Sequence, residues 1–317
     1  MSRVAGRLSA PALVLAAGTC VFTPTARADD PLPTSPIVGG TDTEPGRYDA
    51  VVGVHNSRGK LCTGTLVAPR LVLTAAHCLV EHDVSRAVQI SFGPEGRSHP
   101  LIASESYGTH PQFCYDCDFD AYDFAYVVLS EDYEPADGFI PLLTDPDEWE
   151  ETMRCDAEVL FVGYGTDDPD LNGTLDEQIK REVVSLINRG SPEGTEFFGG
   201  GNDRDTCSGD SGGPAIVTTR DGALRLVGIT SRGTNPCGRG GWYGVPYSVL
   251  PWIEDETGMT LLPADCPDGG CIDLTVAECR PGAQCGCEQS SSDTEPLPWL
   301  LLGLLPLLRT RRSRAQR

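Results

Sequence analysis

The chain has 317 residues, of which 39% are hydrophobic and 22% charged, and its formal net charge is −22. That hydrophobic content can build a core and argues against a chain disordered as a whole, while the length allows one large all-β domain or two ordinary ones. An acidic surface disfavours nucleic acid and anionic membranes as partners. It would attract cationic substrates at low salt, although an acidic coat that only keeps the protein soluble explains the same charge.

The N-terminal part of the chain predicts export. Two arginines precede an apolar run over residues 8–17, and a small-x-small cleavage site follows, so we expect residues 1–28 to be a signal peptide. A lipoprotein cut before Cys20 is the alternative, with Thr19 an unusual residue before such a cut. Residues 29–36 would then be a short pro-segment. The 13 cysteines indicate an oxidising compartment, which agrees with a secreted or cell-surface protein.

Residues 37–262 show the pattern of an all-β domain, a sandwich or barrel. Short β-branched or apolar runs are separated by Gly, Pro, Asp and Asn. The expected strands are 51–54, 65–67, 71–74, 88–92, 124–129, 158–162, 183–186, 214–218 and 224–229. Only residues 247–257, which end at Gly258, have the pattern of a helix.

Three polar residues in this domain carry a chemical argument. His77 follows an expected strand, Asp123 begins another, and Ser211 lies in residues 209–214, which read Gly-Asp-Ser-Gly-Gly-Pro. A serine hydroxyl becomes a good nucleophile when an imidazole takes its proton, and a buried carboxylate can hold that imidazole in the right tautomer. Glycines beside the serine let backbone N–H groups approach a developing oxyanion.

These segments, together with Ile-Val-Gly-Gly at residues 37–40, resemble the chymotrypsin/trypsin family of serine proteases. The resemblance runs to the expected C-terminal helix and implies two six-stranded antiparallel barrels. It also implies that His77 is the general base, Asp123 its orienting acid and Ser211 the nucleophile, with the N–H groups of Gly209 and Ser211 as the oxyanion hole. No metal or other cofactor is implied.

Ser211 also fits the G-x-S-x-G elbow of α/β-hydrolases, whose catalytic histidine follows the serine in the chain. No histidine follows Ser211, which excludes that class. The other histidines are read as structural: His55, His82, His99 and His110.

The resemblance also implies a trypsin-like preference for Arg or Lys in protein or peptide substrates. Asp205, two residues before Cys207, would lie at the floor of the primary pocket, where a buried carboxylate favours a cation. Ser231, Gly233 and Gly244 would complete the substrate-binding wall. The alternative is that Asp205 is only a loop acid.

The sequence departs from the family pattern at three places. Arg232 stands where the family usually has a Trp, and it could repel a cationic substrate group or narrow the neighbouring subsite. Pro246 replaces an aromatic residue expected near the pocket. Pro36 precedes Ile37, where the family is cut after Arg or Lys. The resemblance implies that a freed Ile37 amine would pair with Asp210, so activation needs either a separate protease or a cut of unusual specificity.

The family pattern also implies two disulfides, Cys62–Cys78 and Cys207–Cys237. Cys114 and Cys117 could form a metal or redox motif, but no second ligand pair is evident, so we expect a local disulfide in the loop before Asp123. Cys155 lacks its usual family partner, and we expect its partner in the Cys-rich stalk over residues 263–295, with Cys266 the candidate.

Residues 296–317 form a short apolar run followed by arginines. A helix over the 12 residues 297–308 would be roughly 18 Å long, short of a bilayer core of about 30 Å. The segment resembles C-terminal sorting signals of the MYXO-CTERM class, with Cys287 or Cys285 as the processing cysteine. We therefore expect transient membrane association and a sorting protease. The alternative is a weak transmembrane anchor.

The sequence thus predicts a secreted or surface-associated serine endopeptidase. The rival is a catalytically silent binding module on the same fold, since an uncut Pro36–Ile37 bond would leave the oxyanion hole defective.

Overall fold

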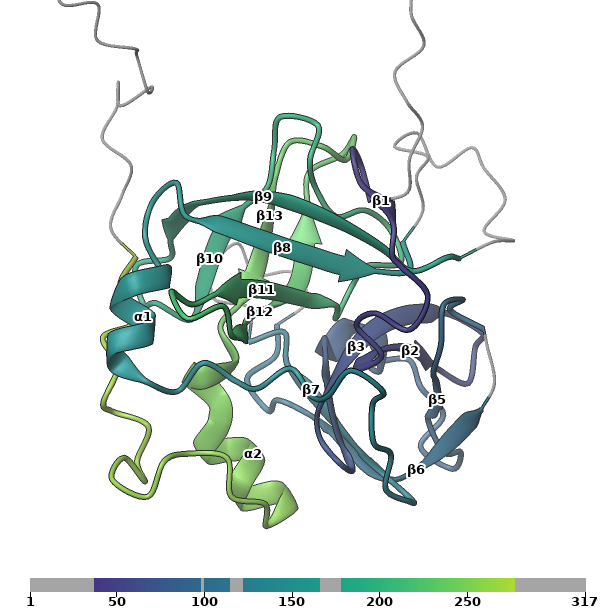
Figure 1. Cartoon of the computed structure of the whole chain (residues 1–317). Helices are drawn as coiled ribbons and strands as arrows, with labels where there is room; N and C mark the ends of the chain where they lie inside the picture. Colours follow the sequence, from purple (N-terminus) through teal and green to yellow (C-terminus); the bar gives the residue numbers. More distant parts are fainter. Residues whose placement is uncertain (1–36, 98–99, 115–121, 166–177, 277–317) are drawn as a thin grey trace, which may run out of the picture. The chain divides into compact units, whose positions relative to one another are not determined.

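The computed structural model describes residues 37–97, 100–114, 122–165 and 178–276 (Figure 1). The expected signal peptide, pro-segment and sorting tail lie outside these residues. Six strands close into a first barrel in the order β2-β3-β4-β7-β6-β5. They are β2 (Val51–His55), β3 (Leu61–Ala68), β4 (Leu71–Thr74), β5 (Gln89–Ser91), β6 (Leu101–Thr109) and β7 (Ala125–Leu129).

A second barrel is formed by the six strands that follow in the chain. They are β8 (Glu158–Gly163), β9 (Arg181–Gly190), β10 (Glu196–Gly199), β11 (Pro214–Thr218), β12 (Leu224–Gly233) and β13 (Gly241–Gly244). They pair in the order β9-β10-β13-β12-β11-β8, and the pairing of β8 with β9 closes the barrel. The short strand β1 (Thr41–Asp42) adds to β9. All pairings are antiparallel, so the predicted fold of two six-stranded barrels is confirmed.

Strands buried on both faces account for the apolar runs in the sequence. All four residues of β4 and all five of β7 are buried, whereas β9 alternates, with Val183, Ser185 and Ile187 inside and Val184 and Leu186 exposed. A strand with one wet face has this period of two. The sequence patterns did not predict the barrel strands β6, β10 and β13, nor the two-residue strand β1.

The helical elements are short. The 3₁₀ turn η1 (Ala76–Cys78) follows β4, and η2 (Pro246–Val249) leads into helix α2 (Leu250–Thr257), which ends at Gly258 in the left-handed conformation. Such a glycine cap matches the expected helix end. Within the described residues, no helix is long and apolar enough to cross a membrane.

Helix α1 (Pro146–Thr152) is not predicted by the apolar pattern, but its start follows from its cap. The Asp145 carboxylate accepts the backbone N–H groups of Asp147 and Glu148 at 2.8 and 3.1 Å, and a proline occupies the first turn. Glu148 also forms a two-point ion pair with Arg225 of β12, at 2.7 Å for each contact. This pair fixes the helix on the second barrel.

A polar clamp joins the two barrels through buried side chains. Tyr164 directly follows β8, and its hydroxyl donates to the carbonyl of Val51 in β2 at 2.9 Å. Lys180 is 2% exposed, and its Nζ donates to the carbonyl of Tyr48 at 2.7 Å. Burial lowers the pKa of Lys180 to about 8. Because buried donors need partners, these bonds hold the N-terminal segment between the barrels.

The chain after α2 continues to pack on the second barrel. Ile272 and Val276 are buried, and a β-carbon at Gly194 would meet Leu274 at 2.6 Å. Cys266 is bonded to Cys271, so the expected Cys155–Cys266 disulfide is wrong, because a cysteine five residues away takes Cys266 instead. Some residues of the predicted stalk thus pack on the second barrel, and the rest of it, residues 277–295, lies outside the described residues.

Candidate active site

His77 reaches the site from η1, directly after the buried strand β4. Its Nδ1 lies 2.7 Å from Oδ2 of Asp123, and its backbone N–H donates to Oδ1 of the same carboxylate at 2.9 Å. Because a carboxylate accepts, Nδ1 carries the proton and Nε2 is left as the basic nitrogen. The Cys62–Cys78 disulfide ties η1 to β3, so the position of the imidazole is fixed from both sides.

Asp123 precedes β7 and is 5% exposed. Besides the two bonds from His77, Oδ2 accepts the hydroxyl of Ser231 from β12 of the other barrel at 2.7 Å. Burial alone would raise the pKa of Asp123, but the hydrogen bonds from His77 and Ser231 outweigh it and hold the pKa below its ordinary value. The carboxylate is therefore ionised and can stabilise a protonated imidazole.

Ser211 lies in the loop between β10 and β11, beside a tight turn. The N–H of Asp210 donates to the carbonyl of Cys207 at 3.0 Å, and Gly209 has φ +102°, which a type II turn requires at its third residue. Gly212 also has a positive φ, and a β-carbon there would collide with Thr74. The glycines of this loop are thus needed for its shape and for its approach to the first barrel.

The described residues show no hydrogen bond between the Ser211 hydroxyl and His77. The sulfur of Cys78 is close to both residues, 3.9 Å from Nε2 of His77 and 3.7 Å from the carbonyl oxygen of Ser211. Nucleophile–base hydrogen bonds are often long in ligand-free sites and tighten on binding. Cys62 and Cys78 also lie near His77, but their sulfurs are joined to each other and are not free to hold a metal.

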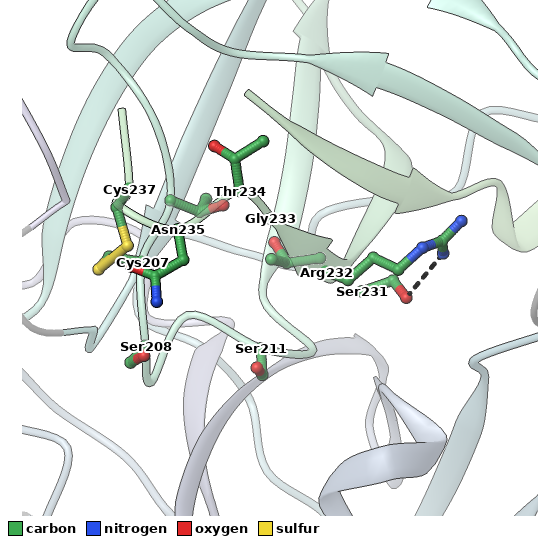
Figure 2. Close-up of a pocket in the computed structure, with 11 residues that line it drawn as sticks. Cys207, Ser208, Ser211, Ser231, Arg232, Gly233, Thr234, Asn235 and Cys237 are labelled. Carbon is green, nitrogen blue, oxygen red and sulfur yellow. Dashed lines mark hydrogen bonds between the residues drawn. A yellow bond between two sulfur atoms is a disulfide. The ribbon is translucent and has the colours of Figure 1, made fainter. Parts of the chain in front are cut away.

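A cavity of about 220 Å³ opens beside Ser211 (Figure 2). Ser208 and Ser211 lie along one side of it, and the end of β12 lies along the other. The Cys207–Cys237 disulfide closes the lining. Both disulfides predicted from the family pattern, Cys62–Cys78 and Cys207–Cys237, are therefore confirmed.

Comparison with known proteins agrees with this geometry. A model of the family described as trypsin matches residues 37–253. The chain belongs to the trypsin family. Trypsin iota of Drosophila melanogaster is 28% identical over 244 residues, which cover 71% of this chain and 90% of that protein. The venom plasminogen activator Haly-PA of Gloydius brevicauda is 27% identical over 242 residues, 69% of this chain and 86% of that protein.

Ovochymase-2 of Mus musculus is 28% identical over 253 residues, which cover 69% of this chain but only 40% of that longer protein. The region shared with these relatives is thus the serine protease domain of the trypsin family.

Asp205, which the resemblance predicts to lie at the floor of the pocket, is 1% exposed and adjoins Thr206 of the cavity lining. Oδ2 accepts the N–H groups of Gly238 and Gly240 at 3.2 and 2.7 Å, and Oδ1 accepts the Thr206 N–H and the Tyr243 hydroxyl at 2.9 and 3.2 Å. Burial raises the pKa of Asp205, although these four donors act against the rise. Asp205 is therefore a buried, hydrogen-bonded carboxylate, whereas Asp203, two residues earlier, is exposed to solvent.

Two expectations about the pocket wall need correction. Gly233 lines the cavity, but a β-carbon at Gly244 would meet the Phe124 ring at 2.7 Å, so Gly244 packs behind Asp123 instead. Gly241 is the residue paired with Gly233. The aromatic side chain beside the buried acid is that of Tyr243, whose hydroxyl donates to Asp205 at 3.2 Å, and Pro246 begins η2.

Arg232 follows Ser231 on the rim of the cavity. Its guanidinium makes a two-point ion pair with Glu196 of β10, at 2.5 and 2.7 Å, and lies 5.6 Å from the centre of the Trp242 ring. Glu196 is only 2% exposed, whereas the Arg232 side chain is 30% exposed. A fixed guanidinium thus stands beside the cavity where family members usually present an apolar ring.

Asp210, adjacent to Ser211, is fully buried. Oδ1 accepts the N–H of Gly165 at 2.8 Å, and Oδ2 accepts the N–H of Cys207 at 2.9 Å. Burial raises the pKa of Asp210 to about 7. The Ile37 side chain is also fully buried, and in the continuous chain its nitrogen belongs to a peptide bond. The expected ion pair between the Ile37 amine and Asp210 could therefore form only after the bond before Ile37 is cut.

Proposed function

We propose that this protein is a serine endopeptidase that cleaves peptide bonds after Arg or Lys. The observation that carries the proposal is the set of three hydrogen bonds on Asp123, from Nδ1 and N of His77 and from Ser231, beside the Ser211 loop. Such a carboxylate orients the imidazole and stabilises its cation. Membership of the trypsin family supports the same reaction class.

In the proposed reaction, Nε2 of His77 takes the hydroxyl proton as Ser211 Oγ attacks the carbonyl carbon of the scissile bond. The N–H groups of Gly209 and Ser211 stabilise the resulting oxyanion. The imidazolium then gives its proton to the leaving amine, which departs and leaves an acyl-enzyme. A water molecule repeats the sequence, with His77 again as the base, and releases the acid product and free Ser211.

The proposed preference for Arg or Lys rests on Asp205. A carboxylate that is 1% exposed, with its charge supported by four donors, places negative charge behind the cavity lining next to Thr206. A cationic side chain that enters is attracted, whereas an apolar one leaves the desolvated charge unpaired. Gly233 and Gly241 leave the wall without side chains.

We further propose that the protein is exported and activated by cleavage before Ile37, with Asp210 accepting the freed ammonium. Three disulfides in the described residues fit an oxidising compartment. The apolar Ile37 side chain already lies in the interior. Sorting through the C-terminal tail belongs to the same proposal.

The proposal is tested with an Arg-directed chromogenic substrate and a serine-directed organophosphate, used on the precursor and on the chain cut before Ile37. We expect the cut form to hydrolyse the substrate and to be labelled at Ser211, and Ser211→Ala to abolish both. Activity that persists in Ser211→Ala would overturn the triad. If neither form is active or labelled while both are folded, the protein is a binding module on this fold.

A further inference from the structure

Thr63 of β3 is a buried residue that contacts both expected oxyanion donors. It is 0% exposed and follows Cys62 directly. Its backbone N–H donates to the carbonyl of Ser211 at 2.9 Å, and its hydroxyl donates to the carbonyl of Gly209 at 2.9 Å. One side chain and one amide of the first barrel thus hold the two residues of the second barrel whose N–H groups would bind the oxyanion.

The remaining polar atoms of Thr63 are also used. The hydroxyl oxygen accepts the N–H of Tyr164 at 3.2 Å, and the carbonyl accepts the hydroxyl of Thr74 at 2.8 Å. Thr74 ends β4, immediately before the turn that carries His77. Thr63 is therefore hydrogen-bonded to the loop that carries Ser211, to the residue that follows β8, and to β4, the strand before His77.

The packing around Thr63 leaves little room for movement. A β-carbon at Gly213 would lie 3.0 Å from Cγ2 of Thr63, and one at Gly163 would lie 3.2 Å from its hydroxyl oxygen. A β-branched side chain has few χ1 rotamers, which limits how far the hydroxyl can turn away. The bond to Gly209 is thus a fixed contact between the barrels.

We propose that Thr63 is a positioning residue for the oxyanion hole, an inference that rests on the proposed protease function. Its hydroxyl fixes Gly209 from the carbonyl side, and the two backbone bonds to Asp210 fix the next residue. The N–H on the other side of Gly209 is then held at a constant position relative to Ser211. Without the hydroxyl, the Gly209 carbonyl and the Tyr164 N–H both lose a buried partner, and the turn shifts.

The test compares Thr63→Val, which keeps the shape and loses the hydroxyl, with Thr63→Ser, which keeps the hydroxyl. Thr65→Val is the matched control, because Thr65 lies two residues along β3, is 0% exposed, and has a hydroxyl with no hydrogen-bond partner among the described residues. Each variant of the cut, active protein is assayed for kcat and KM. Its affinity is measured for an arginine peptide aldehyde, which forms an oxyanion, and for a small aromatic amidine, which only fills the primary pocket.

Thr63→Val should lower kcat by about 10- to 100-fold, because outright loss of one oxyanion donor costs about 10²- to 10³-fold. KM and the affinity for the amidine should change less than about twofold, while the affinity for the aldehyde falls in step with kcat/KM. Thr63→Ser should stay within about threefold of the wild type, and Thr65→Val should leave all four quantities unchanged.

Equal losses of aldehyde and amidine affinity in Thr63→Val, or no loss of either, would overturn the inference. If Thr63→Val does not fold, Thr63→Ser is compared with Thr63→Ala, and equal aldehyde affinities in these two would overturn it as well. A wild-type protein that is neither active nor labelled at Ser211 would instead refute the protease function itself, so the two failures are distinguishable.

Discussion

Two carboxylates near the site are shielded from water, but their surroundings differ. Asp123 lies beside the first barrel, and Asp210 lies in the loop of the second barrel that carries Ser211. Asp123 receives bonds from a histidine ring, a hydroxyl and a backbone N–H, and its pKa is held below the ordinary value. Among the described residues, the Asp210 carboxylate receives two backbone N–H groups, and burial raises its pKa to about 7. Two amide dipoles do not offset full burial, whereas three donors that include a protonatable ring do.

The Asp123 carboxylate is thus fully hydrogen-bonded in the uncut chain, whereas the Asp210 carboxylate awaits a cationic partner. The Asp123–His77 pair needs nothing more to orient the imidazole. Asp210 has no cationic partner within hydrogen-bonding distance among the described residues, and its neighbour Ser211 is the proposed nucleophile. The first region should therefore be indifferent to cleavage before Ile37, and the second should respond to it.

Asp123→Asn should give the largest loss of kcat, because it removes the negative charge that orients His77. The amide can present N–H rather than oxygen to Nδ1 of His77, which favours the wrong tautomer, and kcat should fall about 10⁴-fold as for the same change in related triads. Amidine binding should persist, which shows an intact pocket. An Asn variant within tenfold of wild-type kcat would remove the orienting role of Asp123.

Asp205→Ser should have the next largest effect and should act on selectivity. Loss of a buried charge partner is worth about 2–5 kcal/mol, so kcat/KM for Arg and Lys peptides should fall about 10²- to 10³-fold. Peptides with Phe or Leu at the cleaved position should be nearly unaffected. Asp203→Ser is the matched control two residues away, and the same loss of Arg selectivity in both variants would count against the pocket role of Asp205.

Asp210 should make the stability of the uncut chain depend on pH. Its folded pKa of about 7 lies above the ordinary 3.8, so between these values the folded chain keeps a proton that the unfolded chain has lost. Stability then falls as pH rises through this window, with a contribution approaching 1.4 kcal/mol per pH unit at about pH 5–6. Urea unfolding at pH 4.5, 5.5 and 6.5 measures the slope.

Asp210→Asn should lack this contribution. The chain cut before Ile37 should lack it too, because an ammonium partner lowers the pKa of the carboxyl. Activity of the cut form should then fall at alkaline pH as the α-amine, with an ordinary pKa of about 7.7–8.0 raised by its partner, loses its proton. Identical slopes in the precursor, the cut chain and the Asn variant would contradict the assigned pKa of Asp210.

The fold class was predictable from the sequence because the catalytic motifs and the apolar runs agree with each other. The strands that were missed share a physical reason. β10 and β13 are four-residue strands ended by glycine, and β6 has polar residues on its wetter face, so none of them shows a continuous apolar run. Their pairing, not their composition, makes them strands.

The site was less predictable where it depends on packing between distant segments. His77, Asp123 and Ser211 could be found from local motifs, but the assignment of Gly244 to the pocket could not be corrected without the pairing of Gly233 with Gly241. The contact of Thr63 with Gly209 joins residues 146 positions apart, and a lone threonine in a strand carries no signal of it.

The smallest expected effect concerns Arg232 and Glu196, a third arrangement in which the buried carboxylate has a full cationic partner. Glu196 neutralises much of the guanidinium charge, so the wild type should disfavour Lys only weakly at the position just before the cleaved residue. A partly exposed charge contact is worth up to about 1 kcal/mol, so kcat/KM for a Lys peptide should be no more than about fivefold below that for the matching Leu peptide. Arg232→Leu should abolish this discrimination, and Glu196→Gln, which removes one negative charge beside the guanidinium, should increase it. The measurement is kcat/KM for peptide pairs that differ only in Lys or Leu at each of the three positions before the cleaved Arg. If both variants shift the ratio in the same direction, the effect is steric and the charge of Arg232 does not shape the subsite.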